Sequence, residues 1–304
     1  MTMVSEQPRP DRFYKYASAA GTVAMLRNLN VWWKSPPLFN DPFDTQLRLN
    51  LGCTAEQIVA AAAPVVEALI YSSEPLDPGM DERIRRAVLL ERSRATPELR
   101  PTVAAGVAVG LRTQLPTIQR SLDDGQAQWT SFLDSMRVLS VSEINDDILM
   151  WSHYADCHKG AVLELRPLPG VEAWDAKPIR YATDIPVMAS AEQWVRHVFG
   201  LSPINFEAFF EAFAFTKSAH WAYEREWRCR ITDADPARDV PGQPLIWACP
   251  LRPDQVTGVY LGCRMSDADR TDLRDAVRAR APNARMYEAV KSPSRFSLDF
   301  RPGS

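Results

Sequence analysis

The alternation of hydrophobic and polar residues predicts strands at the start, in the middle and at the end of the chain. RFYKYA (12–17) and NVWWK (30–34) are rich in aromatic residues, and MRVLSVSE (136–143) alternates between two faces. Further candidates are GAVLELR, EWRCRIT, PLIWACP, VTGVYLGCR and ARMYEAV. Short runs of aromatic and β-branched residues favour strands over helices.

Helical patterns separate these strands. Residues 54–128 are rich in Ala, Arg and Glu, and Thr54 with Gln57 forms a capping box that would start the first helix. Prolines divide this region into about four short helices; they stand at positions 64, 75, 78, 97, 101 and 116. A second helical region is predicted over 189–223, and Ser266 would cap a last helix. We therefore expect one α+β domain, 11–304, with a mixed, split sheet and a helical insertion at 54–128.

Charge and cysteine content narrow the class of protein. The formal net charge is −3, which gives no global basic character for non-specific binding to nucleic acid. The five cysteines are scattered and form no C-x-x-C pair, as is typical of reduced thiols in a cytoplasmic protein. The first residues lack the apolar stretch of a secretory signal, and no run is long enough to cross a bilayer. We expect a cytoplasmic protein without membrane contact.

The segment MWSHYADCHKG (150–160) carries two of the four histidines of the chain. Asn145 would cap a helix whose apolar stripe includes Trp151, and this stripe would pack into the core. His153 or Tyr154 would then point into a polar cleft. His153 and Cys157 are one helical turn apart, but the segment supplies no third and fourth ligand for a metal.

Two further segments concentrate polar side chains. In HWAYEREWRCR, a strand from Glu224 would place Glu224, Glu226 and Arg228 on one face and Trp227 on the other. That face is either a ladder of surface ion pairs or a carboxylate oriented by a neighbouring arginine. In FNDPFD, the Asn-Asp-Pro sequence is first a turn former, although Asn40, Asp41 and Asp44 also offer oxygens to a hydroxyl group or a cation.

Several of these segments together carry a resemblance. FYKY, FNDPFD, SVSE, LMWSHYADCHKG, TKSAHWAYEREWR and VYLG, in this order, resemble a bacterial family catalogued only as a domain of unknown function. The likeness covers most of the chain outside the helical insertion. A fainter likeness is to the ADP-ribosyltransferase fold, which carries a polar or aromatic residue on a first strand, Ser or Tyr on a second strand and Glu, sometimes as E-x-E, on a late strand. Tyr14 or Lys15, Ser140-Val141-Ser142 and Glu224-Arg225-Glu226 stand in that order, although only Arg12 offers a basic residue of the usual kind near the first position.

The second resemblance implies an enzyme that uses NAD. Cleavage of the nicotinamide–ribose bond develops an oxocarbenium ion, which a positioned carboxylate stabilises. The implied catalytic residue is Glu226, with His153 and Tyr154 beside it. The residues implied to bind the cofactor are Tyr14, Lys15, Asn40, Asp41, Asp44, Ser142, Lys217, Glu224 and Arg228. The implied activity is that of an NAD-dependent transferase or NAD hydrolase in stress or phage defence.

Two other functions use the same residues. A metal-dependent hydrolase or nuclease would use Asp41, Asp44, His153 and Glu226. A non-enzymatic protein would bind a nucleotide, a dinucleotide or a partner in the same cleft. The acceptor and the oligomeric state stay open, and the region 54–128 could supply a wall of the cleft or the contact of a homodimer.

Overall fold

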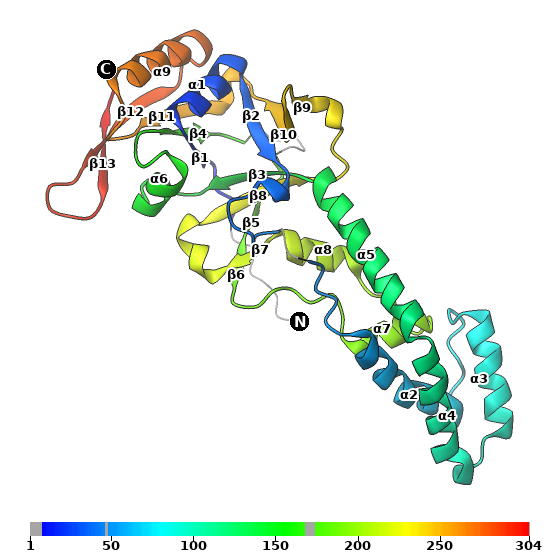
Figure 1. Cartoon of the computed structure of the whole chain (residues 1–304). Coiled ribbons are helices and arrows are strands. Elements are labelled where there is room, and N and C mark those ends of the chain that lie inside the picture. Colours follow the sequence, from blue (N-terminus) through cyan, green and yellow to red (C-terminus); the bar gives the residue numbers. More distant parts are fainter. Residues whose placement is uncertain (1–7, 46–47, 168–173, 304) are drawn as a thin grey trace. The chain divides into compact units, whose positions relative to one another are not determined.

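The strands predicted along the chain join one mixed, largely antiparallel sheet in the computed structural model (Figure 1). The structure describes residues 8–45, 48–167 and 174–303. Its strands are β1 (Phe13–Ala17), β2 (Asn30–Lys34), β3 (Arg137–Ser142), β4 (Ala161–Leu165), β5 (Lys177–Pro178), β6 (Arg180–Ala182), β7 (Thr216–Ser218), β8 (Glu226–Ile231), β9 (Asp239–Val240), β10 (Gln243–Pro250), β11 (Val256–Leu261), β12 (Arg285–Lys291) and β13 (Leu298–Pro302). The predicted α+β class is confirmed.

The chain forms two compact units. The sheet unit comprises the described residues of 1–46, 132–184 and 215–304, and the helical unit those of 47–131 and 185–214. The helices are α1 (Ala19–Asn28), α2 (Ala55–Tyr71), α3 (Glu82–Arg94), α4 (Arg100–Thr113), α5 (Leu115–Ser135), α6 (Ile148–Tyr154), α7 (Ala191–Val198), α8 (Phe206–Ala214) and α9 (Asp267–Arg280).

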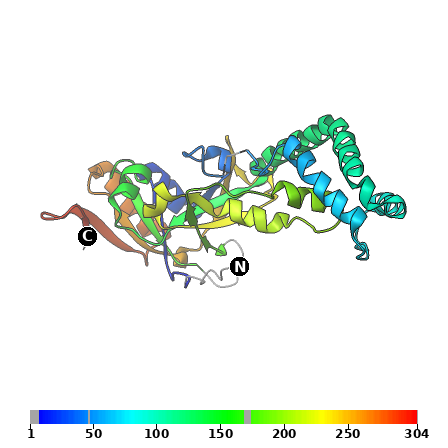
Figure 2. The ribbon, with the colours of Figure 1, turned by 90° about the horizontal axis from the view of Figure 1, so that it is seen from below.

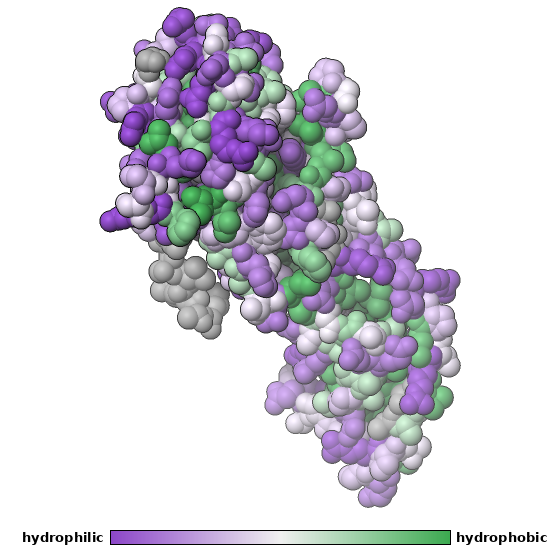
Figure 3. Space-filling model, turned by 60° about the vertical axis from the view of Figure 1, so that its left-hand side comes forward, coloured by the Kyte–Doolittle hydropathy of each residue, from purple (hydrophilic) through white to green (hydrophobic). Residues whose placement is uncertain are grey.

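On the face shown in Figure 3, hydrophilic residues and small hydrophobic groups are interspersed over both units. No helix of the described residues is long and apolar enough to cross a membrane.

The sheet is split in its middle. The strand order is β13-β12-β11-β4-β1-β3-β2-β10-β9. In addition, β8 pairs with β3, and β5 pairs with β8. β1 pairs with β4 along its whole length but with β3 at the single position Tyr14 opposite Ser142. β2 likewise meets β3 only where Lys34 lies opposite Val138, whereas β3 pairs with β8 over six positions. The strands β1, β2 and β3 therefore diverge, and this opening positions the candidate site.

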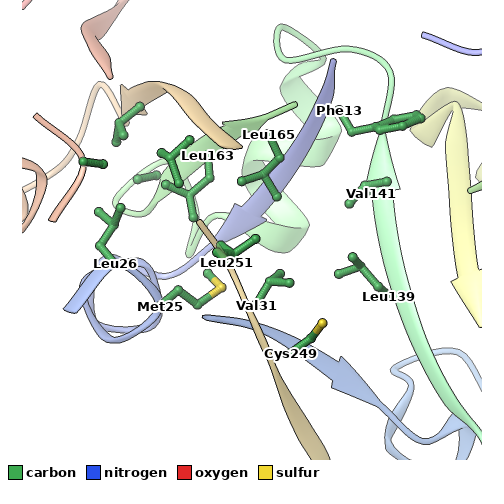
Figure 4. Close-up of a cluster of buried hydrophobic side chains, with 14 of the residues drawn as sticks. Phe13, Met25, Leu26, Val31, Leu139, Val141, Leu163, Leu165, Cys249 and Leu251 are labelled. Atoms are coloured by element: carbon green, nitrogen blue, oxygen red, sulfur yellow. The ribbon is translucent and has the colours of Figure 1, made fainter. Parts of the chain in front are cut away.

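The two faces of the sheet carry different helices. Leu163 and Leu165 of β4 belong to the main core cluster, together with buried side chains of α1 and α9. Figures 1 and 2 show these two helices side by side, and Figure 4 shows part of the cluster. Val162 points to the other face because side chains alternate along a strand, and there it packs with Trp151 of α6.

Three local predictions need correction. The capping box of Thr54 and Gln57 is confirmed, but Pro64 lies inside α2 and does not end it. Pro64 is exposed, so water can satisfy the carbonyl group that loses its partner, while buried residues on both sides hold the helix. The region predicted as one helical segment, 189–223, contains α7, α8 and then β7. The cap of α6 is Asp147 rather than Asn145, since the Asp147 carboxylate accepts hydrogen bonds from the amides of Leu149 and Met150.

Candidate functional site

A cleft of about 410 Å³ opens where the three strands diverge, within the sheet unit. β1 contributes Tyr14 and Lys15, and β3 contributes Ser140 and Ser142. The ammonium group of Lys15 donates a hydrogen bond of 2.8 Å to the carbonyl oxygen of Ser140. Lys15 thereby replaces a backbone partner that the split removes, since an unpaired buried carbonyl would be costly.

Most of the residues predicted from the sequence line this cleft. These are Tyr14, Lys15, Asn40, Asp44, Ser142, His153, Tyr154, Lys217, Glu224 and Glu226. They come from five separate segments, so the fold brings together motifs that are up to 212 positions apart in the sequence, from Tyr14 to Glu226. Asp41 and Arg228 are not part of the lining: Asp41 faces a second pocket, and Arg228 is buried against Glu226.

Five charged groups form a buried cluster at one end of the cleft. The ammonium group of Lys217 lies 2.5 Å from Glu224, 3.0 Å from Glu226 and 3.3 Å from Asp44. The guanidinium group of Arg228 contacts Glu226 at 2.6 Å and Asp44 at 2.5 Å. All five side chains are at most 5 % exposed. With every group ionised, three carboxylates face two cations, so the cluster carries one net negative charge.

The predicted alternation along β8 holds within the strand. Glu226 and Arg228 lie on one face and form an ion pair, and Trp227 is buried in the core cluster on the other. Glu224, however, precedes the strand in a short 3-10 helix, Ala219–Glu224, and Arg225 adopts a left-handed backbone with φ of 43°. This turn, rather than a continuous strand, points Glu224 at the same ammonium group as Glu226.

The surroundings shift the pKa values of Glu224 and Glu226 in opposite directions. Burial, together with repulsion from Glu226, raises the pKa of Glu224 to about 7, although Lys217 opposes the shift. Burial would also raise the pKa of Glu226, but Arg228 and Lys217 outweigh it and hold that pKa well below its ordinary range. Near neutral pH, Glu226 is therefore an ionised carboxylate, whereas Glu224 exchanges a proton. Such a divergent pair is a common arrangement for acid–base work.

Helix α6 supplies two further side chains. The Tyr154 hydroxyl donates a hydrogen bond of 2.6 Å to Glu224, and Asn40 donates one of 3.5 Å to Tyr154. His153 is exposed, and its Nδ1 lies 2.9 Å from the hydroxyl of Tyr223. Trp151, on the opposite side of α6, is fully buried and donates to the carbonyl of Asn145. The helix thus has an apolar anchor and a polar edge, as the sequence predicts.

Ser142 supports the cluster through the backbone. Its hydroxyl donates to the carbonyl oxygen of Glu224 at 2.6 Å and accepts from the amide of Ile144 at 3.1 Å. The residue is almost completely buried. Ser142 therefore fixes the turn that carries Glu224, which is a positioning role.

Sequence reasoning missed several residues of the cleft. Trp32, Lys34 and Phe39 also line it, and Tyr181 accepts a hydrogen bond of 2.7 Å from the amide of Glu226. Lys34 acts on Lys15: burial first, and then repulsion from Lys34, lower the pKa of Lys15 to about 8. In NVWWK, Trp32 and Lys34 stand two positions apart and so share one face of the strand, and this pattern could have indicated that both line the cleft. Nothing local in the sequence indicates Tyr181.

A metal centre does not fit this arrangement. Among the described residues, no group of three or more His, Cys, Asp or Glu side chains has the arrangement needed to hold a metal ion. Asp44 and Glu226, two of the ligands considered, already bind the positive charges of Arg228 and Lys217. Asp41 faces the second pocket instead. A divalent cation would have to displace these ammonium and guanidinium groups.

Comparisons with protein-family models, with curated proteins and with solved structures found no match for this chain. The two resemblances drawn from the sequence therefore stay predictions.

Proposed function

We propose that the protein is an enzyme that binds NAD, or a closely related nucleotide, in the cleft and cleaves its N-glycosidic bond. The product ADP-ribose would pass to an acceptor or to water. The observation that carries the proposal is the pair of glutamates that share the ammonium group of Lys217 while their pKa values are moved in opposite directions.

The electrostatics suit a substrate that gains positive charge. An oxocarbenium ion is stabilised by a preorganised negative environment that excludes water. The buried cluster has a net charge of −1 when Glu224 is ionised and of zero when it is protonated. In this proposal, Glu226 is the permanent carboxylate, held in place by Arg228. Glu224 supplies the second charge or accepts a proton from the acceptor.

The rest of the cleft suits the other parts of a nucleotide. Lys15 and Lys34 offer positive charge to phosphate groups at the end where β1 and β2 diverge. Tyr14, Trp32 and Tyr154 offer aromatic surface to a base. A volume of about 410 Å³ lies within the range usual for ligand sites.

Three variants test the proposal after thermal unfolding with NAD and release of nicotinamide have been measured for the parent. A ligand that prefers the folded state raises the unfolding midpoint. Glu226→Gln should lower turnover by about 10²–10³-fold, the size usual for loss of a preorganised charged group. Glu226→Asp keeps the charge but retracts the carboxylate, so it should also be slow while NAD still binds. Asp239→Asn is the matched control.

Asp239 is a suitable control because it is a carboxylate outside the lining of the cleft that also pairs with a buried arginine. It accepts hydrogen bonds from Arg137 at 2.8 Å and 2.9 Å. Turnover that falls equally in Asp239→Asn and Glu226→Gln would count against the proposal. NAD binding without nicotinamide release by the parent would identify a nucleotide-sensing protein instead of an enzyme.

The biological setting belongs to the same proposal. A cytoplasmic enzyme that consumes NAD or modifies an acceptor would act in stress or phage defence, as the resemblance implies. A homodimer is also part of this proposal. Size measurement in solution, with and without NAD, tests whether it forms.

A further inference from the structure

A second pocket, of about 340 Å³, lies beside the cleft in the sheet unit. Its lining consists of Asp41, Phe43, Ser218, His220, Trp221 and Tyr223. We call it the aromatic pocket, because three of these six side chains are phenyl, indole or phenol rings. The proposed NAD chemistry does not use it.

The aromatic pocket and the cleft share two segments of chain. In the first segment, Asn40 and Asp44 line the cleft, while Asp41 and Phe43 line the aromatic pocket. In the second, residues 217 and 224 line the cleft, whereas the aromatic pocket takes its lining from four residues between them. Residues of both segments therefore line the two cavities in turn.

Two of the three rings of the aromatic pocket, those of Trp221 and Tyr223, are held in place before any ligand binds. The indole N–H of Trp221 donates to Asp41 at 2.6 Å, and its ring centroid lies 5.9 Å from that of Tyr223. The hydroxyl of Tyr223 is bonded to His153 at 2.9 Å. Phe43, in contrast, is 67 % exposed, which is unusual for so large an apolar side chain. Ordered rings at a surface bind with little loss of side-chain entropy.

A buried carboxylate borders the pocket. Asp41 lies behind Trp221 and is 8 % exposed, so solvent screens its charge only weakly. Burial, and then the charges of Glu224 and Asp147, raise the pKa of Tyr223 to about 12, with Lys217 opposing. The ring of Trp221 already accommodates a cation, because the ammonium group of Lys217 lies 5.1 Å from it. Ring faces and carboxylates both attract positive charge.

The polar atoms of the pocket are largely occupied. Asp41 accepts from the amide of Phe43 at 2.9 Å as well as from Trp221, and the Ser218 hydroxyl is paired with His220 at 3.0 Å. The hydroxyl of Tyr223 is engaged by His153. A primary ammonium or a guanidinium group brings three or five N–H donors, and the hydrogen bonds within the pocket leave few acceptor positions for them. A quaternary ammonium group carries no N–H donor and avoids this cost.

We propose that the aromatic pocket binds a quaternary, trimethylated ammonium group, held by Phe43, Trp221 and Tyr223 and by the charge of Asp41. The group has two sources, a small molecule of the choline type or a trimethylated lysine side chain, and both present the same cation. The inference does not depend on the reaction in the cleft, so it stands or falls separately from the proposed NAD chemistry.

Binding is measured by NMR on the C–H signals of the ligand, with saturation transfer from the protein. The probes are choline, its neutral carbon isostere 3,3-dimethylbutan-1-ol, and ethanolamine as the primary ammonium. Choline should bind about tenfold more tightly than either of the other two, because only it combines charge with the absence of N–H donors. Equal binding of choline and 3,3-dimethylbutan-1-ol would overturn the proposal, as would binding of neither choline nor Nα-acetyl-trimethyllysine amide.

Two substitutions locate the site. Phe43→Ala should weaken choline binding about threefold to fivefold, and Asp41→Asn should weaken it further. Phe296→Ala is the matched control because Phe296 is a fully exposed phenylalanine far along the sheet, between β12 and β13. A loss in Phe296→Ala equal to that in Phe43→Ala would overturn the assignment. Nα-acetyl-trimethyllysine amide is then compared with choline to identify the source of the trimethylammonium group. The probe that binds more tightly makes contacts beyond the aromatic pocket and so indicates that source.

Discussion

The two units of the protein bury different kinds of side chain. Every buried polar or charged side chain among the described residues lies in the sheet unit, from Thr22 to Gln255. In the helical unit, the described buried side chains are all apolar, as where Ile58 and Ala62 of α2 pack with Val195 of α7. Another example is Trp129, whose ring lies 4.6 Å from that of Phe213.

This difference separates stability from function. Burying a charge is costly unless the group is paired, so a fold gains little from a cluster of five buried ions. Among its described residues, the helical unit achieves its packing without any such group. The sheet unit keeps the cluster where three strands diverge and a cleft opens, which indicates that the charges serve the cleft rather than the fold.

The largest expected effect comes from removing one charge of the cluster. Arg228→Ala leaves Glu226 and Asp44 buried without their main partner and should destabilise the protein by about 3–5 kcal/mol. Arg86→Ala in the helical unit is the control, because Arg86 makes an exposed pair with Glu82 at 2.7 Å. That change should cost less than about 0.5 kcal/mol. Chemical denaturation of both variants measures the two values, and similar costs would show that the cluster is not energetically distinct.

A second prediction concerns pH. The pKa of Glu224 is raised to about 7, so between its unfolded value of about 4.3 and 7 the folded state holds more protons than the unfolded state. Its contribution to stability is therefore fully present below the unfolded pKa and is lost as pH rises through 7, by on the order of 3–4 kcal/mol. Glu226, with its lowered pKa, has the opposite sign: its contribution is present above its unfolded pKa and is lost in acid.

Glu224→Gln isolates the first of these two contributions. Urea denaturation from pH 4 to pH 8 should show that the parent loses stability relative to the variant as pH rises through this range. Parallel curves for parent and variant would mean that Glu224 titrates normally. Turnover, if Glu224 acts in its ionised form, should rise over the same range.

The sequence predicted features that depend on a few neighbouring residues more fully than contacts between distant segments of the chain. Period-2 alternation placed Glu226, Arg228 and Trp227 correctly, and the capping box placed the start of α2, because both depend on neighbours within a few residues. Proline and cap assignments failed at Pro64 and Asn145, where packing and a competing aspartate decided the outcome.

The site itself depends on contacts between distant segments. Lys217 was expected in the cleft, but its position on three carboxylates requires the turn at Arg225 and the loop of Asp44 together. The pKa of Glu224 follows from that convergence and from burial, neither of which a local pattern encodes. The aromatic pocket escaped prediction for the same reason, since FNDPFD and HWAYE become neighbours only in the fold.

The smallest expected effects come from replacing one histidine in each unit with alanine. His153 in the sheet unit is exposed, whereas His197 in the helical unit is half-buried and accepts a hydrogen bond of 3.3 Å from the amide of Ile204. His153→Ala should change the free energy of unfolding by no more than about 0.5 kcal/mol, and His197→Ala should cost about 1 kcal/mol. Only His153→Ala should alter ligand binding, because His153 lines the cleft and holds Tyr223 of the aromatic pocket. Titrations of both variants with NAD and with choline check this, and an effect of His197→Ala on either ligand would show that the helical unit also shapes binding.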